Sequence, residues 1–301
     1  MSWQLGLARF EAELDRSLQR AAKAAGGGER LWPADTQTLA RFLRIDDDAA
    51  RGLDAIRQQF DPAAELARLS GEGITFTGVG EDGYPPLLAG TFDPPFGLFT
   101  MGAALTTLCG DRPVIGVVGS RRPSAAGLTL ARTISQGLAA RGGVIVSGLA
   151  LGIDAAAHQG AIDLAAPTIA VTGASPEIIN PRSNAETRRD ILRSGAVTSE
   201  YWPGTPPAPW RFPARNRITA GLCHAVVVIE AGLRSGSLIT ADIALELGLP
   251  VLVVPHTPAP GAAGSNALLR AGALVCESAD DVIAELGDLA WNTEPEGTTI
   301  G

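Results

Sequence analysis

Three turns rich in glycine and serine follow apolar runs in this sequence, and their composition suits the binding of an anion. The first turn is Gly119–Gly127, in which Ser120, Arg121, Arg122 and Ser124 stand among small residues. Small residues let backbone N–H groups approach a phosphate, and arginine supplies a formal positive charge. Ser124 is placed to cap the next helix or to donate to a ligand. The spacing matches neither GxGxxG nor GxxxxGK[ST], so neither a dinucleotide site nor a P-loop is predicted.

The second turn starts at Ser147 and Gly148 and enters a predicted helix that carries Asp154 and His158. Because these two residues are four apart, they are neighbours on a helix, and the carboxylate could orient the imidazole. The interpretation we favour is that Asp154 serves the helix N-terminus while His158 packs against the sheet. No nucleophile has an evident partner here, and the scattered histidines predict no metal site. No cofactor is predicted either.

The strongest nucleic-acid signal is a segment in which arginines alternate with aromatic residues: Trp210, Arg211, Phe212, Arg215 and Arg217. Arginine neutralises backbone phosphates, and aromatic rings offer surfaces on which bases stack. The alternative is a solvated loop whose aromatic rings are buried in the core. Asn216 is placed where it could cap a helix that follows the loop.

The third turn, Ser235–Ser237 with Gly236 at its centre, is a second possible anion nest. Glu230 stands beside it at the end of an apolar run. This carboxylate could bind a sugar hydroxyl, or it could pair with Arg215 or Arg217. The sequence leaves these possibilities open, and a structural ion pair is the one we favour.

Short β-branched runs alternate with alanine- and leucine-rich stretches of helical length, and these elements must position the turns. The runs are Val114–Val118, Val144–Val146, Thr168–Val171, Val197–Ser199, Ala225–Ile229 and Val251–Val254. Because they are apolar throughout, they suit strands covered on both faces, which predicts an α/β fold with a doubly wound, mostly parallel, Rossmann-like sheet. Ligands of such sheets lie beyond the carboxyl ends of the strands, where the three turns stand.

The remaining segments differ in composition. Residues 1–70 carry apolar residues at helical spacing, which predicts a small helical N-terminal domain, SAM-like or similar. Residues 71–110 contain two proline pairs and are expected to form a linker or extension packed on the core. Residues 111–287 form the predicted Rossmann-like domain, and 288–301 a polar tail. No apolar run is long enough to cross a membrane, and no signal peptide is evident, so a cytoplasmic protein is expected.

The net charge of -8 argues against a polyphosphate partner, but the charge is unevenly distributed. Between Asp111 and Arg217 there are 12 arginines and 7 acidic residues, whereas the rest of the chain is strongly acidic. Arginine is the residue whose planar fork grips phosphate oxygens in pairs. The sequence therefore predicts a local basic face.

Several motifs occur together in this chain: Gly119-Ser120-Arg121 with Ser124 and Gly127, SGLA-x-GID-x-x-AH, FPARNRI-x-AGL and EA-x-x-x-SGSL-x-TA. Together they resemble the DprA/Smf family of DNA-processing proteins. The resemblance runs from about residue 80 to residue 287. It implies a cytoplasmic bacterial protein that is not an enzyme, binds single-stranded DNA on a Rossmann-like domain, forms a homodimer, and loads the RecA recombinase onto incoming DNA during natural transformation.

Matched residue by residue, the resemblance implies phosphate contacts for Arg121 and Ser124. It further implies a pocket lined by Ser147 and Gly148, DNA contacts from Arg215 and Arg217, and completion of the site by Ser235–Ser237. Three departures stand out: Leu151 replaces a lysine common in the family, the turn 173–181 differs, and no C-terminal winged helix is expected.

Two other functions remain as alternatives. One is a phosphoribohydrolase-like enzyme with Glu230 as acid or base, but the chain lacks the Thr-x-x-Glu spacing of that group. The other is a sensor that binds a nucleotide without catalysis, because the same turns suit a mononucleotide.

Overall fold

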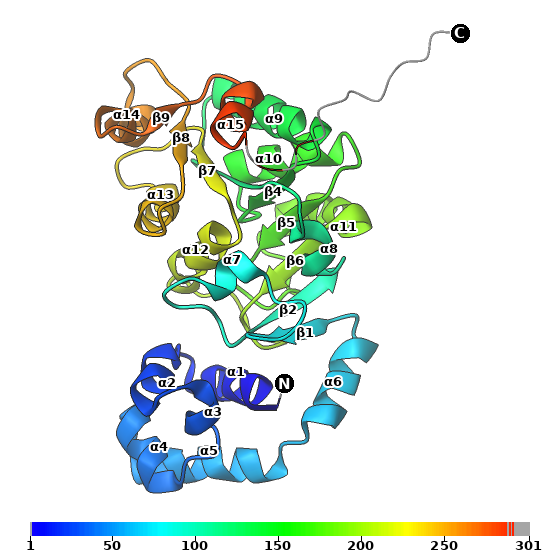
Figure 1. The fold of residues 1–301 in the computed structure, drawn as a ribbon, viewed down its shortest axis with the longest axis vertical. Helices are drawn as coiled ribbons and strands as arrows, with labels where there is room; N and C mark the ends of the chain where they lie inside the picture. The colour runs from blue at the N-terminus through cyan, green and yellow to red at the C-terminus, as the bar shows by residue number, and fades with distance from the viewer. Residues whose placement is uncertain (1, 288, 290, 292–301) are drawn as a thin grey trace.

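A nine-stranded sheet forms the centre of the protein, with the strand order β1-β2-β6-β5-β4-β3-β7-β8-β9 (Figure 1). The structure, a computed structural model, describes residues 2–287, 289 and 291. The strands are β1 (Thr75–Gly78), β2 (Gly97–Gly102), β3 (Val114–Val118), β4 (Val144–Ser147), β5 (Thr168–Val171), β6 (Ala196–Ser199), β7 (Ala225–Val228), β8 (Val251–Val253) and β9 (Leu274–Val275). The pairings from β6 across to β9 are parallel, and those of β1 with β2 and of β2 with β6 are antiparallel. The predicted fold class is confirmed.

The order of the strands reverses at β3. From β3 the chain steps through β4 and β5 to β6, and it then returns to place β7 on the other side of β3. Val118 at the end of β3 consequently lies opposite Val228 at the end of β7. The crevice beyond these two strand ends is the switch point at which open α/β sheets bind ligands.

Helices cover both faces of the sheet, as its apolar strands require. One face packs against α9 (Ala125–Ala140), α10 (Ile153–Ile162), α11 (Ala185–Ser194) and α15 (Ala279–Glu285). The other packs against α7 (Pro86–Ala89), α8 (Leu105–Cys109), α12 (Arg211–Gly221), α13 (Gly236–Glu246) and α14 (Ala263–Arg270). Along β3 the side chains alternate: Ile115 and Val117 face the first group, and Val114 and Val118 the second. Two 3-10 turns, η1 (Arg182–Asn184) and η2 (Pro260–Ala262), complete this part of the chain.

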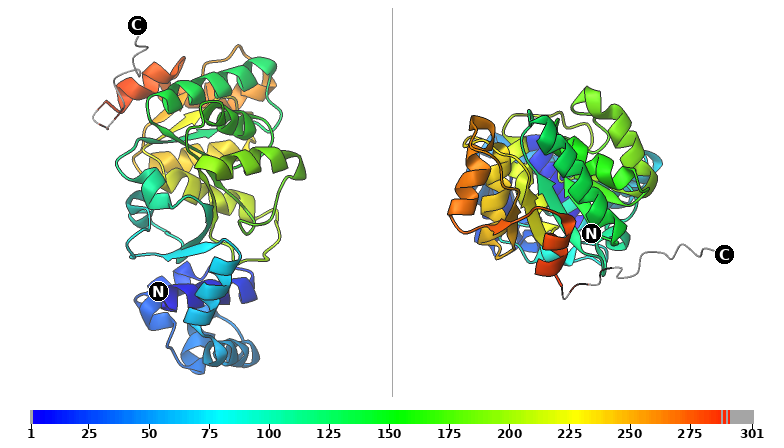
Figure 2. Two further views of the ribbon diagram at one scale, coloured as in Figure 1. Left: turned by 90° about the vertical axis from the view of Figure 1, so that its right-hand side faces the viewer. Right: turned by 90° about the horizontal axis from the view of Figure 1, so that it is seen from above.

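Six helices precede the sheet in the chain: α1 (Ser2–Leu14), α2 (Gln19–Ala25), α3 (Gly28–Leu31), α4 (Thr36–Leu43), α5 (Asp47–Gln59) and α6 (Pro62–Gly71). The aspartates Asp35, Asp46 and Asp61 cap the last three by accepting backbone N–H groups. The first five share a core around Phe10 and Leu39, whereas α6 packs against β1 and β2 through Leu69. Figure 2 shows them gathered at one end of the molecule, next to β1 and β2.

The segment 71–110, expected as a linker or extension lying on the core, instead contributes β1 and β2 to the sheet itself. Its proline pairs lie between the two strands, where no ladder hydrogen bond is lost. The polar tail expected over 288–301 lies outside the described residues, apart from 289 and 291. In the part of the chain that the structure describes, no helix has both the length and the apolar character needed to cross a membrane.

Candidate nucleic-acid interface

A cleft of about 1000 Å³ opens at the switch point beyond the ends of β3 and β7. The turns after β3, β4 and β7 form its sides together with α12 and the start of α13. Nine of the predicted site residues line it: Ser120, Arg121, Arg122, Gly148, Arg215, Asn216, Ser235, Gly236 and Ser237. Turns that are far apart in the sequence meet here because parallel strands end at the same edge of a sheet.

The turn after β3 presents two exposed cations to the cleft, Arg121 and Arg122. The guanidinium of Arg121 lies over the ring of Phe212, 5.4 Å from its centroid, which is a cation–π contact. Within the turn, the Oγ of Ser120 accepts the backbone N–H of Arg122 at 3.0 Å. The turn thus holds its backbone internally and leaves both guanidinium groups accessible to a ligand.

Arg215 forms the floor of the cleft. Only 5% of this residue is exposed, so it is largely buried beneath the cleft. Its Nη1 donates to the carbonyl oxygen of Val171 at 2.6 Å, while its Nε is buried without a partner. Burial lowers the pKa of Arg215, and the nearby Asp154 acts in the opposite direction. A Cβ at Gly148 would lie 2.0 Å from Nη1, so a side chain at this position would displace the guanidinium.

Asp154 and His158 have structural roles in the second turn and helix. Asp154 is 8% exposed and accepts the backbone N–H of Ala150 at 3.3 Å. His158 is fully buried, with its Nδ1 2.7 Å from the Oγ1 of Thr168. Burial lowers the pKa of His158 to about 3, so the imidazole stays neutral near pH 7. The interpretation that His158 packs against the sheet therefore agrees with its position.

The turn after β7 forms the opposite wall of the cleft. Ser235 caps α13, and its Oγ lies 2.7 Å from the Oγ of Ser237. The prediction that Asn216 caps a following helix is wrong, because this residue lies inside α12. Its Nδ2 donates to the carbonyl of Gly236 at 3.0 Å. The exposed Arg234 also lines the cleft and was missed, although it is the basic residue of this turn.

The cleft is strongly cationic. Its described lining contains four arginines, Arg121, Arg122, Arg215 and Arg234, and a single carboxylate, that of Asp154. Apolar groups such as Phe212 stand between these charges. This combination suits a ligand that carries phosphates and flat apolar groups.

Three predicted residues of the first two turns serve the fold instead of lining the cleft. The N–H and Oγ of Ser124 both donate to the carboxylate of Glu230, at 3.0 Å and 2.7 Å. The N–H of Gly127 donates to the Oγ of Ser124 at 3.0 Å. Ser147 is fully buried, and its Oγ donates to the carbonyl of Val117 at 2.6 Å. Glu230 therefore directs its hydrogen bonds to Ser124, not to Arg215 or Arg217 as expected.

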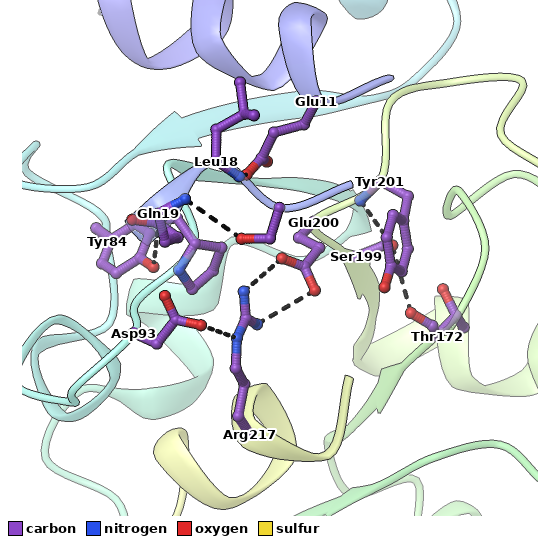
Figure 3. A network of polar contacts seen from close by, with 12 residues as sticks. Glu11, Leu18, Gln19, Tyr84, Asp93, Thr172, Ser199, Glu200, Tyr201 and Arg217 are labelled. Carbon is purple, nitrogen blue, oxygen red and sulfur yellow. Dashed lines mark hydrogen bonds and ion pairs between the residues drawn. The ribbon is translucent and has the colours of Figure 1, made fainter. Parts of the chain in front are cut away.

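Arg211 and Arg217 point away from the cleft, towards the N-terminal helices. Arg217 pairs with Glu200 at 2.6 Å and with Asp93 at 3.1 Å (Figure 3). Burial acts to lower the pKa of Arg217, but these two carboxylates outweigh it and the pKa is raised. Arg211 is buried and pairs with Asp15. We call this cluster the junction, and it comprises Glu11, Asp15, Asp93, Glu200, Arg211 and Arg217.

The two faces of α12 explain this division. The helix expected to start after a loop near Asn216 already begins at Arg211, with Pro213 in its first turn, where a missing N–H costs little. The cleft face carries residues three or four apart: Phe212, Arg215, Asn216 and Thr219. The junction face lines a second cavity of about 200 Å³ with Arg211, Ala214 and Arg217. Helical periodicity therefore separates the three arginines.

The fold and the cationic cleft define an anion-binding protein of the Rossmann-like class. The chain belongs to the family of DNA recombination-mediator protein A, whose profile matches residues 75–287. It is 36% identical over 265 residues to the DNA processing protein DprA of Bacillus subtilis, covering 85% of this chain and 89% of that protein. The corresponding protein of Streptococcus pneumoniae is 43% identical over 206 residues, covering 68% and 72%. The resemblance inferred from the motifs is confirmed.

Solved structures show the same relationship. DprA from Streptococcus pneumoniae superimposes with a TM-score of 0.76 at 34% identity, covering 89% of this chain and 93% of that one. DNA processing protein A from Helicobacter pylori, for which a single-stranded DNA binding mode is described, gives a TM-score of 0.63 at 30% identity. That match covers 70% of this chain and 95% of the other.

Proposed function

We propose that the protein binds single-stranded DNA in the cleft, chiefly through backbone phosphates. The observation that carries this proposal is the set of four arginines facing a single carboxylate at the switch point. Arg215 adds a buried guanidinium whose Nε has no partner. A phosphate oxygen is the acceptor that would satisfy such a donor. Phe212 supplies a ring on which a base can stack.

We further propose that the bound strand is handed to the RecA recombinase during natural transformation, by a homodimer acting in the cytoplasm. Support comes from membership of the recombination-mediator family. The protein would act by binding alone, without catalysis. In support, the His158 imidazole is buried and neutral and does not line the cleft, and the Asp154 carboxylate is already engaged by the backbone N–H of Ala150.

The deciding experiment is fluorescence anisotropy of a labelled single-stranded oligonucleotide at two salt concentrations, beside a duplex of the same length. We expect a preference for the single strand, because its bases can turn towards Phe212. The logarithm of affinity should fall with the logarithm of salt concentration by about 0.7 for each phosphate contact. Absence of binding at low salt, or equal binding of the duplex, would refute the proposed function.

A further inference from the structure

The N-terminus of α9 is the position at which a Rossmann-like fold ordinarily receives the phosphate of a nucleotide. This 16-residue helix begins directly after the turn that follows β3, at the switch point. Backbone N–H groups there lack partners within the helix and carry partial positive charge. An anion placed at this end would be strongly favoured.

In this protein the end of α9 already holds an anion, the carboxylate of Glu230. Both of its oxygens accept the N–H of Ser124, at 3.0 Å and 3.2 Å, and one also accepts the Oγ of Ser124 at 2.7 Å. Glu230 is 5% exposed, so its position is fixed. A Cβ at Gly127 would lie 2.5 Å from the same carboxylate, which shows how closely Glu230 approaches the first turn of α9.

Glu230 reaches α9 from the neighbouring strand. It follows β7, which pairs with β3, and its own carbonyl accepts the N–H of Ser120 at 2.6 Å. The backbone and the side chain of Glu230 therefore both hold the turn that carries Arg121 and Arg122. The arginines themselves extend into the cleft, away from this internal contact.

We infer that Glu230 makes the cleft selective for a nucleic-acid strand over free nucleotides, because its carboxylate occupies the place of a nucleotide's terminal phosphates. This inference rests on the proposed function. A nucleoside diphosphate concentrates its charge in one compact group and needs a concentrated site such as a helix N-terminus. An internucleotide phosphate carries one charge and binds through many separate contacts, which exposed arginines provide. A carboxylate at α9 repels the first ligand far more than the second.

The test compares the affinity for ADP of the wild type, Glu230→Ala and Glu230→Gln by isothermal titration calorimetry. Removing the negative charge should raise the affinity for ADP by roughly tenfold or more. Glu230→Ala also removes the acceptor for Ser124 and can destabilise the fold. Glu230→Gln keeps the shape of the side chain and one oxygen that accepts from Ser124. This variant therefore removes the charge without removing the contact that holds the turn. Glu246→Gln is the matched control, because it removes the same charge from an exposed position at the far end of α13.

Affinity for a labelled oligonucleotide is measured on the same samples. The inference predicts that the ratio of the affinity for ADP to the affinity for the oligonucleotide rises by roughly tenfold or more in each Glu230 variant, because a shift of the turn that carries Arg121 and Arg122 affects both ligands. Folded variants that gain no affinity for ADP would refute it, as would a wild type that already binds ADP as tightly as they do. Failure of every sample to bind the oligonucleotide would refute the proposed function instead, and the comparison with ADP would still be readable.

Discussion

The two faces of α12 place the same kind of side chain in opposite electrostatic settings. On the junction face, Arg217 meets two carboxylates, and the protein itself satisfies its charge. On the cleft face, Arg215 is held by a backbone carbonyl, and the nearby Asp154 accepts the backbone N–H of Ala150 in the turn after β4. An arginine of this protein is therefore available to bind a phosphate when no carboxylate is paired with it.

The excess of arginine counted along the sequence therefore overestimates the positive charge that lines the cleft. The excess of arginine between Asp111 and Arg217 includes two side chains whose charge is balanced within the junction. Conversely, Arg234 lies outside that stretch and adds to the cleft. Variants that act on one face alone can test this division.

The largest effect is expected from Arg217→Ala. This change leaves Glu200 and Asp93 in the junction without their partner, which should lower the free energy of unfolding by about 3 kcal/mol. Urea denaturation measures this loss. The affinity of the folded protein for single-stranded DNA should stay nearly constant, because Arg217 does not line the cleft.

Arg193→Ala is the control for Arg217→Ala, because Arg193 pairs with Asp190 on an exposed surface and such pairs contribute little. If Arg217→Ala unfolds like the wild type and yet loses DNA binding, the assignment of Arg217 to the junction is wrong.

Gly148→Ala should disturb the floor of the cleft. The added Cβ would lie 2.0 Å from the Nη1 of Arg215, so the guanidinium must move. We expect weaker DNA binding together with a loss of about 2 kcal/mol in stability from overpacking. Gly236→Ala is a matched control in the same cleft, because a Cβ there meets nothing within 4 Å. Equal DNA binding by both variants would show that the position of Arg215 is unimportant.

Arg121→Ala should weaken DNA binding by about tenfold, in any sequence, and reduce the salt dependence by about one phosphate contact. Its melting temperature should not change, because Arg121 is exposed. Arg141→Ala removes the same charge at the other end of α9 and should leave DNA binding unchanged. If the salt dependence of Arg121→Ala equals that of the wild type, Arg121 does not contact a phosphate.

The sequence predicted the central strands and the place of the cleft because both follow from local patterns. A strand buried on both faces must be apolar throughout, and glycine and serine after it mark a turn at the strand end. The strands β1 and β2 were missed because the two proline pairs that lie between them indicated turns and extended chain, not strands of the sheet. Their pairing depends on contacts with β6, far along the chain.

The side chains of the site were harder to place. Pro213 and the neighbouring aromatic residues are not typical of a helix start, so the beginning of α12 was not recognised. The arginines could therefore not be assigned to helix faces. Glu230 lies 106 residues from its partner Ser124, and no local pattern announces that contact. Once a helix beginning at Arg211 is assumed, the spacing of Phe212, Arg215 and Asn216 does predict a shared face.

The smallest expected effect is a pH dependence of stability that arises from Glu11, the junction carboxylate that is not paired with Arg211 or Arg217. Glu11 accepts the N–H of Leu18 at 2.8 Å, and burial, followed by the charge of Glu200, raises its pKa from 4.5 to about 8. Between these values the folded protein binds a proton that the unfolded chain releases. The free energy of unfolding should therefore fall as pH rises from about 5 to 8.

Glu11→Gln removes this titration, so its melting temperature should depend less on pH over that range than that of the wild type. Glu13→Gln, on the exposed side of the same helix, is the control and should keep the wild-type dependence. Melting curves at pH 5.5 and 8.5 distinguish the two. Affinity for single-stranded DNA should be the same in both variants, because the junction and the cleft lie on opposite faces of α12. A change in affinity specific to Glu11→Gln would mean that the two faces are coupled through the helix.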